Sequence, residues 1–195
     1  MATKIRPAKL RSDYYAALEE ALAAKERALL RTHPTQYVED CLDALHFITT
    51  VLKMHVIFIT FDINTRDIAE TLQEQGGTLS RVYMIDAMSI ISGKGTPPVS
   101  RLITVYRPDN FTDIEVYTRV FLKKVDFSNV CVFFNSLFNL EQYQNWNEVG
   151  VFLRVFGEFL ERYEVPQVAI LHDQVDFVED MIISRNAQRI IYMRQ

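Results

Sequence analysis

The chain has 195 residues, of which 49% are hydrophobic and 24% charged, a length and balance typical of one globular domain with a buried core. Its formal net charge of −4 disfavours general nucleic-acid binding, because a protein neutralises phosphates with a basic surface. No stretch approaches the roughly 20 apolar residues that cross a bilayer, and no signal peptide opens the sequence. We therefore expect a cytoplasmic protein with no membrane partner.

The two cysteines and the N-terminal segment carry no predicted chemistry. Cys41 and Cys131 lie far apart and each has apolar neighbours, so both are interpreted as small hydrophobic residues in a reducing compartment. We predict neither a disulfide nor a zinc site. Residues 1–11 are locally basic and are expected to form a flexible tail, followed by a single domain over residues 12–195.

Helices are predicted where apolar residues recur at helical spacing after a capping residue. The predicted helices cover residues 13–25, 36–52, 65–75, 113–123, 146–163 and 174–184. The predicted N-caps are Ser12, Thr35, Asn64 or Thr65, and Thr112. Gly76 and Gly77 are expected to end the third helix, because glycine tolerates the left-handed backbone of a helix C-terminus.

Strands are predicted at short apolar runs, of which residues 55–61 are β-branched and aromatic throughout. These runs cover residues 55–61, 82–85, 102–106, 130–134, 168–171 and 189–192. Residues 28–31 form a further strand or continue the first helix. Uniformly apolar strands that alternate with helices favour right-handed crossovers and a sheet covered on both faces. The predicted fold is α/β: one three-layer α/β/α domain with a mostly parallel sheet and an N-terminal helix.

Polar residues stand at the carboxyl ends of several predicted strands, where parallel α/β sheets bind ligands. The candidate crevice residues are Thr32, Asp62, Asp86, Asn135, Ser136 and His172. Two carboxylates and a histidine could form an acid/base cluster or a weak metal site. Alternatively, Asp62 and Asp86 cap loops or bond exposed backbone N–H groups where strands end. We favour this structural alternative and predict no catalytic residue, no metal and no cofactor.

One segment superficially matches part of a phosphate-binding loop. Residues 93–96 read Gly-Lys-Gly-Thr, but that loop needs an earlier glycine, where Met88 stands, and must open directly into a helix. Pro97 and Pro98 follow, and proline lacks the N–H group that the helix start would present. The segment is therefore predicted to be a surface loop.

The ordered segments resemble the RecA/KaiC-like superfamily of P-loop ATPases, in particular archaeal KaiC-like proteins with degenerate nucleotide sites. HVIFITFD, RVYMIDAMS and VCVFFNSLFNLEQY occur in the order of the family's strands, and the last is similar to the Walker B strand. The resemblance covers residues 27–195 and implies a RecA-like sheet.

The departures from the family's pattern fall on its ATP-hydrolysing parts. After the first strand the chain reads LLRTHPTQYVEDCLDALHFI, with no glycine, no lysine and a proline at Pro34. The acidic pair that would activate water is reduced to Asp62 followed by Ile63, and Asn135 replaces the aspartate on the magnesium side. Phosphoryl transfer depends on positioned N–H groups and charge, so we expect no ATP hydrolysis.

The resemblance therefore implies a regulatory, scaffold or protein-interaction module that has lost ATP hydrolysis. Its expected partner is a second copy of the chain, an active KaiC-like protein or a signalling protein. Aromatic residues expected to anchor such an interface are Tyr14, Tyr15, Tyr37, Tyr143 and Trp146. The alternative is a small-ligand or nucleotide sensor, or a residual enzyme, that uses the crevice at the strand ends. DNA binding of the recombinase kind is disfavoured, because the chain is acidic and lacks a basic aromatic groove.

Overall fold

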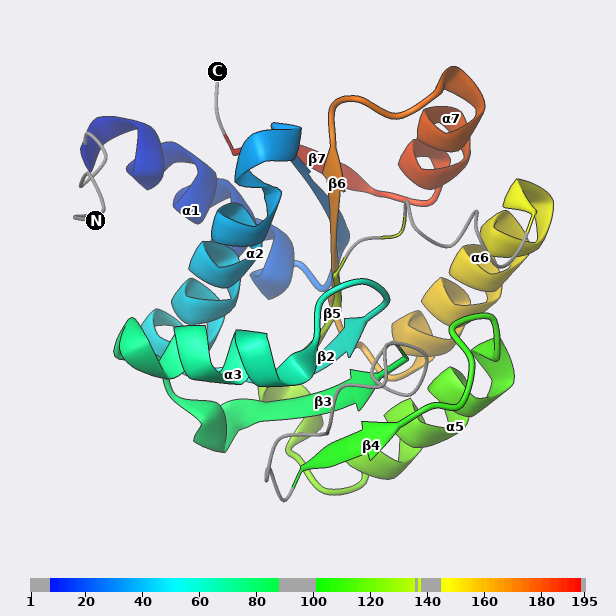
Figure 1. The fold of residues 1–195 in the computed structure, drawn as a ribbon, viewed down its shortest axis with the longest axis horizontal. Coiled ribbons are helices and arrows are strands. Elements are labelled where there is room, and N and C mark those ends of the chain that lie inside the picture. The colour runs from blue at the N-terminus through cyan, green and yellow to red at the C-terminus, as the bar shows by residue number, and fades with distance from the viewer. Residues whose placement is uncertain (1–7, 88–100, 136, 138–144, 194–195) are drawn as a thin grey trace.

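The computed structural model of the protein describes residues 8–87, 101–135, 137 and 145–193, with side chains from residue 13 onward (Figure 1). The described strands form one seven-stranded sheet in the order β4-β3-β2-β5-β6-β1-β7, and every neighbouring pair is parallel. The strands are β1 Arg27–Thr32, β2 His55–Thr60, β3 Val82–Asp86, β4 Leu102–Thr104, β5 Val130–Asn135, β6 Gln167–His172 and β7 Arg189–Tyr192. The predicted parallel sheet is confirmed.

Helices cover both faces of the sheet, which makes three α/β/α layers (Figure 1). The described helices are α1 Ala8–Ala23, α2 Tyr37–His46, α3 Thr65–Glu74, α5 Phe111–Leu122, α6 Trp146–Arg162 and α7 Phe177–Arg185. The first three pack on one face, and the last three pack on the other.

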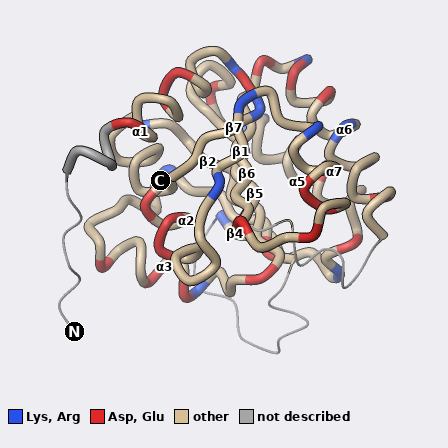
Figure 2. Tube along the Cα trace, turned by 90° about the horizontal axis from the view of Figure 1, so that it is seen from above, with Lys and Arg blue, Asp and Glu red and all other residues tan. Residues whose placement is uncertain are grey.

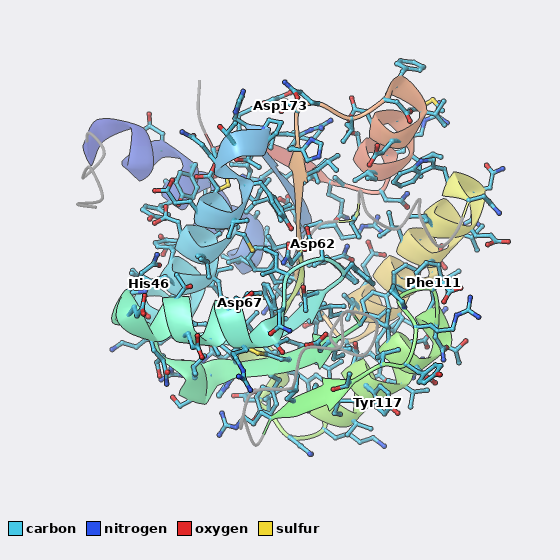
Figure 3. The ribbon with its side chains drawn as sticks, in the orientation of Figure 1. His46, Asp62, Asp67, Phe111, Tyr117 and Asp173 are labelled. Atoms are coloured by element: carbon cyan, nitrogen blue, oxygen red, sulfur yellow. The ribbon has the colours of Figure 1, made fainter. Side chains whose placement is uncertain are left out.

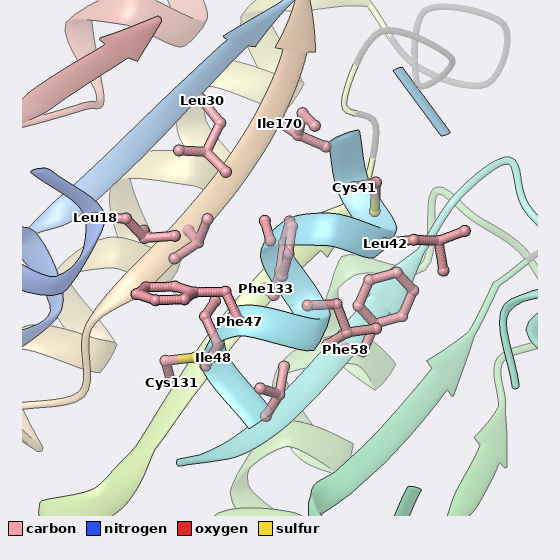
Figure 4. Close-up of a cluster of buried hydrophobic side chains, with 14 of the residues drawn as sticks. Leu18, Leu30, Cys41, Leu42, Phe47, Ile48, Phe58, Cys131, Phe133 and Ile170 are labelled. Carbon is pink, nitrogen blue, oxygen red and sulfur yellow. The ribbon is translucent and has the colours of Figure 1, made fainter. Parts of the chain in front are cut away.

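Each face of the sheet contributes to its own hydrophobic core, because successive strand residues point to opposite faces. On the first face, Phe58 of β2 meets Phe133 of β5 edge-on, at 5.5 Å between ring centroids (Figure 4). On the second face, Phe134 packs against Phe156 of α6 at 5.3 Å. Both faces are therefore apolar, which explains why the strand sequences show no polar alternation.

Two expectations about the N-terminal region are settled by the structure. Residues 28–31 belong to strand β1 and do not continue the first helix. Helix α1 begins at Ala8, so the prediction of Ser12 as its cap is wrong, and residues 8–11 belong to the helix instead of the tail. The described tail residues therefore continue the helix toward the N-terminus.

Other helix boundaries were partly misplaced because nearby residues compete for the capping role. Before α2, the short 3-10 helix Pro34–Gln36 is capped by His33, whose Nδ1 accepts from the Thr35 N–H, so Thr35 is not the cap. Asn110 caps α5 in place of Thr112 by accepting from the Asp113 N–H. Helix α7 starts at Phe177, three residues later than predicted, because Asp176 accepts from the first N–H groups of the helix.

The remaining elements are found where they were predicted, although some ends differ by one or two residues; the strand predicted over residues 102–106, for example, ends at Thr104. Asn64 caps α3, as predicted, by accepting from the Arg66 N–H, and Gly76 follows the helix with a left-handed φ of 76°. Helix α2 continues into a π turn, Phe47–Val51, so the predicted helix has the right extent but not a uniform winding. The loop of residues 93–98 lies outside the described residues.

The aromatic residues expected at an interface are mostly packed inside. Tyr14 and Tyr37 are buried, and Tyr15 stacks on Phe47 with ring centroids 4.2 Å apart. Trp146 is half-buried, and Tyr143 lies outside the described residues. The prediction that Tyr14 and Tyr37 are exposed anchors is wrong. Tyr14 of α1 and Tyr37 of α2 both belong to the hydrophobic core on the first face of the sheet.

Charged positions are spread over the molecule. In Figure 2, acidic and basic positions are interspersed along the helices in view. Among the described residues, no helix is both long and apolar enough to cross a membrane.

Candidate functional site at the carboxyl edge of the sheet

The strand order creates two places at the carboxyl edge where neighbouring strands lead to opposite faces. β1 is followed by α2 on the first face, whereas its neighbour β6 is followed by α7 on the second. β2 and β5 differ in the same way, through α3 and α6. Such reversals open the crevice in which α/β sheets bind ligands. Most of the candidate residues flank these two reversals.

The pairing register divides the candidates into two groups. Thr32 pairs with His172 across β1 and β6. Thr60, at the end of β2, pairs with Asn135 on one side and Asp86 on the other. Sequence reasoning did not single out Thr60, although it ends the apolar run that predicts β2.

Beside Thr32, the start of α2 holds a buried carboxylate. The Thr32 hydroxyl donates to the carboxylate of Asp40, and both residues are almost completely buried, at 1% and 0% exposure. Asp40 belongs to the first turn of α2, where unpaired backbone N–H groups and the helix dipole favour a negative charge. A helix start of this kind is where phosphate-binding folds hold their anion. In this protein the Asp40 carboxylate is the negatively charged group at that helix start.

A second carboxylate is tied to the same helix start. The hydroxyl of Tyr37, the first residue of α2, donates to both carboxylate oxygens of Asp62, at 3.1 and 2.9 Å. Burial raises the pKa of the Cys41 thiol well above its ordinary value, and the nearby Asp62 and Asp40 carboxylates raise it further. Cys41 is therefore a neutral, buried thiol, and it lies close to both carboxylates.

Asn135 is hydrogen-bonded, through Thr60, to the turn that follows β2. Its Nδ2 donates to the Thr60 hydroxyl oxygen at 3.3 Å, and that hydroxyl donates in turn to the Ile63 carbonyl at 2.7 Å. The Asn135 side chain is fully buried, and its Oδ1 has no hydrogen-bond partner among the described atoms. A hard cation prefers anionic oxygen ligands, which a neutral amide does not supply. Ser136 lies outside the described residues.

Asp86 is fully buried at the end of β3 and accepts from the hydroxyl of Thr65, the first residue of α3, at 2.6 Å. Asp62 and Asp86 thus both hold the start of a helix against the sheet. The donors in these bonds are hydroxyl groups of Tyr37 and Thr65, whereas the sequence analysis expected backbone N–H groups. Both carboxylates therefore have a structural contact here, but not the one that the sequence analysis expected.

His172 stands apart from the two carboxylates. Burial lowers the pKa of its imidazole, and Arg31 lowers it further while Asp173 opposes the shift. β2 and β5 separate the strand of His172 from that of Asp86, a spacing of about 14 Å across three strand intervals. Figure 3 likewise shows Asp62 and Asp173 well apart.

These positions do not assemble the acid/base or metal cluster that the sequence left open. Among the described residues, no three His, Cys, Asp or Glu side chains could hold a metal ion together. Asp40 and Tyr37 were not assigned to the crevice from the sequence, because only the ends of strands were considered. The acidic pair Glu39 and Asp40, five residues after Pro34 and in the first turn of a predicted helix, was the available signal.

A cavity of about 450 Å³ lies elsewhere, between α5 and α6. Phe111, Phe152 and Phe156 form much of its apolar lining, and the first two rings stack at 4.1 Å. Its volume suits a small ligand. Its lining contains no histidine, cysteine or lysine, so it offers apolar contact more than nucleophilic chemistry.

Comparison with known proteins identifies a shared fold but does not assign the chain to a family. No family model matches the chain, and no curated protein matches it. The chain is similar to a solved structure titled as the uncharacterized protein PH0321 from Pyrococcus horikoshii in complex with an unknown peptide. The TM-score is 0.62 at 10% sequence identity, over 86% of this chain and 77% of that chain. At this identity the likeness shows the shared α/β/α fold alone.

Proposed function

We propose that the chain is a non-catalytic, KaiC-like interaction module of the cytoplasm, which binds a protein partner and does not hydrolyse ATP. The partner is a second copy, an active KaiC-like protein or a signalling protein. The observation that carries the proposal is the buried Asp40 carboxylate at the start of α2, bonded to Thr32.

The electrostatics of that position oppose a phosphate. A unit negative charge about 5 Å from Asp40 is disfavoured by about 3 kcal/mol at an effective dielectric constant of about 20. Asp62, held by Tyr37, adds a second carboxylate near the same helix start. This repulsion is at least as large as the roughly 1.5–3 kcal/mol that one hydrogen bond to the charged phosphate would return. With Asn135 at the end of β5, no described carboxylate replaces the missing magnesium ligand at that strand end.

The structural neighbour adds support of a different kind. The Pyrococcus horikoshii protein, which shares the fold, was crystallised in complex with an unknown peptide. A fold of this kind accommodating a peptide supports a peptide- or protein-binding role for this chain.

The proposal is tested by two measurements on the purified full-length chain. Phosphate release from magnesium ATP is expected to equal the buffer blank, and calorimetry is expected to detect no ATP binding. Light scattering after size-exclusion chromatography at tens of micromolar is expected to show self-association, or a complex when a candidate partner is added. Metal-dependent phosphate release would refute the proposal, and so would a strict monomer that binds none of the candidate partners.

A second candidate function is a small-ligand sensor, which the buried Oδ1 of Asn135 favours because it lacks a hydrogen-bond partner among the described atoms. A ligand N–H group could donate to it. Thermal-shift measurements with nucleotides and nucleobases test this candidate, because a ligand at 100 times its dissociation constant stabilises by about 2.7 kcal/mol. A shift that is lost in Asn135→Leu would support the sensor, and no shift with any of these ligands would exclude it.

A further inference from the structure

The amino-terminal edge of the sheet, opposite the candidate crevice, carries a group of cations. We refer to these residues as the basic edge: Lys25, Lys53, Arg81, Arg101 and Lys124. The first four stand just before β1, β2, β3 and β4 in turn, and Lys124 follows α5. Parallel strands all begin at one edge, so these positions share it. None of the five forms an ion pair with a described carboxylate, although the whole chain has a net charge of −4.

Two of the cations flank one aromatic pair. The rings of Tyr83 and Phe121 lie 5.1 Å apart between centroids. The Arg101 guanidinium lies 4.9 Å from the Tyr83 centroid, and the Lys124 ammonium lies 5.7 Å from that of Phe121. The Nη1 of Arg101 is buried and has no hydrogen-bond partner among the described atoms. The aromatic contacts position both charges without neutralising them.

Arg81 and Lys25 donate to backbone carbonyl groups of other described residues. Arg81 Nη1 donates to the Lys53 carbonyl at 2.7 Å, and Lys25 Nζ donates to the Ser128 carbonyl at 3.3 Å. Burial lowers the pKa of His55, and Arg81 and Arg101 lower it further, which places both guanidinium groups near that imidazole. Asp126 is the carboxylate that opposes this shift. Hydrogen bonds from Ser128 chiefly lower the pKa of Asp126, and nearby His55 and Lys25 lower it further, so Asp126 offsets part of the positive charge of the edge.

The backbone at two of the lysines is unusual. Lys25 and Lys53 have φ values of 60° and 57°, and Glu164, before β6, has 53°. This left-handed conformation favours glycine and costs other L-residues about 1–2 kcal/mol. All three follow the C-terminus of a helix, where a left-handed residue ends the helix through bonds such as that from the Glu26 N–H to the Ala21 carbonyl. Glu164 stands in the same kind of turn with the opposite charge.

We propose that the basic edge docks an acidic, extended segment of a partner protein. The inference rests on the proposed function and names the partner's chemistry. From β4 to β1 the edge spans five strand intervals, about 24 Å, which an extended chain covers with about seven residues. Asp126 and Glu164 precede β5 and β6, between Lys53 and Lys25. A peptide can place uncharged residues opposite these two carboxylates, whereas a nucleic acid presents a phosphate at every step, so the edge fits a peptide better.

The test uses a fluorescein-labelled peptide of about eight glutamate and glycine residues, titrated onto the full chain at low salt. The variants are Lys25→Gly, Lys53→Gly and their combination. Each replaces a left-handed lysine with the residue that this backbone favours, so the fold is retained. Glu164→Gly is the matched control, with the same backbone change and the opposite charge change.

The expected loss of affinity is about two- to fivefold for each lysine and about four- to twentyfold for the double variant, as for exposed charge pairs. Glu164→Gly is expected to bind the peptide equally or more tightly. Bound peptide should also raise the pKa of His55 in NMR titrations, because its carboxylates offset Arg81 and Arg101. A His55→Gln variant assigns the signal.

The proposal is overturned if the peptide does not bind, if the lysine variants bind like Glu164→Gly, or if a single-stranded oligonucleotide binds more tightly with the same lysine dependence. These results are distinguishable from failure of the proposed function. A chain that neither releases phosphate nor binds the acidic peptide, yet self-associates, retains the proposed function and loses only this inference. Phosphate release from ATP refutes the proposed function whatever the peptide does.

Discussion

The bond between Thr32 and Asp40 is the contact whose removal is most informative. In Thr32→Val the side chain keeps its shape, but the fully buried Asp40 carboxylate loses the hydroxyl that donates to it. Hydrogen bonds to charged groups contribute about 1.5–3 kcal/mol, and the valine side chain cannot supply this bond. We therefore expect Thr32→Val to lower the free energy of unfolding by about 1.5–3 kcal/mol, a large share of the roughly 5–15 kcal/mol of a typical domain.

Urea denaturation at pH 7, followed by circular dichroism, measures this loss as a lower midpoint with an unchanged m-value. Thr32→Ser is the matched control, because it keeps the hydroxyl and removes one methyl group, for an expected loss of about 0.8 kcal/mol. If Thr32→Val is as stable as Thr32→Ser, Asp40 does not depend on the bond. That result would mean that the Thr32 hydroxyl does not hold the Asp40 carboxylate in place at the start of α2.

Three further predictions address the crevice, the basic edge and the core. Asn135→Asp is expected to restore no magnesium-dependent phosphate release, because the glycine-rich loop is still missing; measurable turnover in this variant would show that the site was misplaced. The pKa of His55 is below its ordinary value of 6.5 in the folded protein, so the unfolded state binds more protons and the free energy of unfolding should fall as the pH drops from about 7.5 through that range. Urea midpoints at several pH values should fall less steeply in His55→Gln, and parallel curves would contradict this sign. Phe133→Ala should lose about 3–5 kcal/mol of stability, because the ring is fully buried against Phe58. Phe177→Ala, at a side chain that is 80% exposed, should stay within about 0.5 kcal/mol of the parent in the same assay.

The strands were predictable because both faces of the sheet are covered. The run His55–Thr60 is buried at nearly every position, so its sequence is apolar without alternation. β1 was ambiguous because Arg31 and Thr32 interrupt the pattern. Arg31 is nevertheless buried, since Asp180 of α7 pairs with it, and that partner is distant in the sequence. Local pattern alone does not reveal such a partner.

The candidate site was only partly predictable for a related reason. Topology fixes which residues stand at strand ends, and Thr32, Asp62, Asp86 and Asn135 are all found there. What each side chain bonds depends on where the following helix begins. The His33 cap and the 3-10 turn after β1 set the start of α2 and bring Asp40 to Thr32, a consequence of backbone geometry that periodicity does not encode.

The two edges of the sheet differ in which internal hydrogen bonds a bound ligand would have to break. At the carboxyl edge, the Asp40 and Asp62 carboxylates already accept bonds from Thr32 and Tyr37, so a ligand there must break internal bonds worth about 1.5–3 kcal/mol each or add its charge beside them. At the amino edge, Lys25 and Arg81 donate to neutral carbonyl groups, so an acidic partner adds charge contacts without breaking one. Exposed charge pairs contribute at most about 1 kcal/mol each, and several acting together are needed for a stable complex. For that reason an extended segment that reaches all five cations is a better ligand for this chain than a single small anion at either edge.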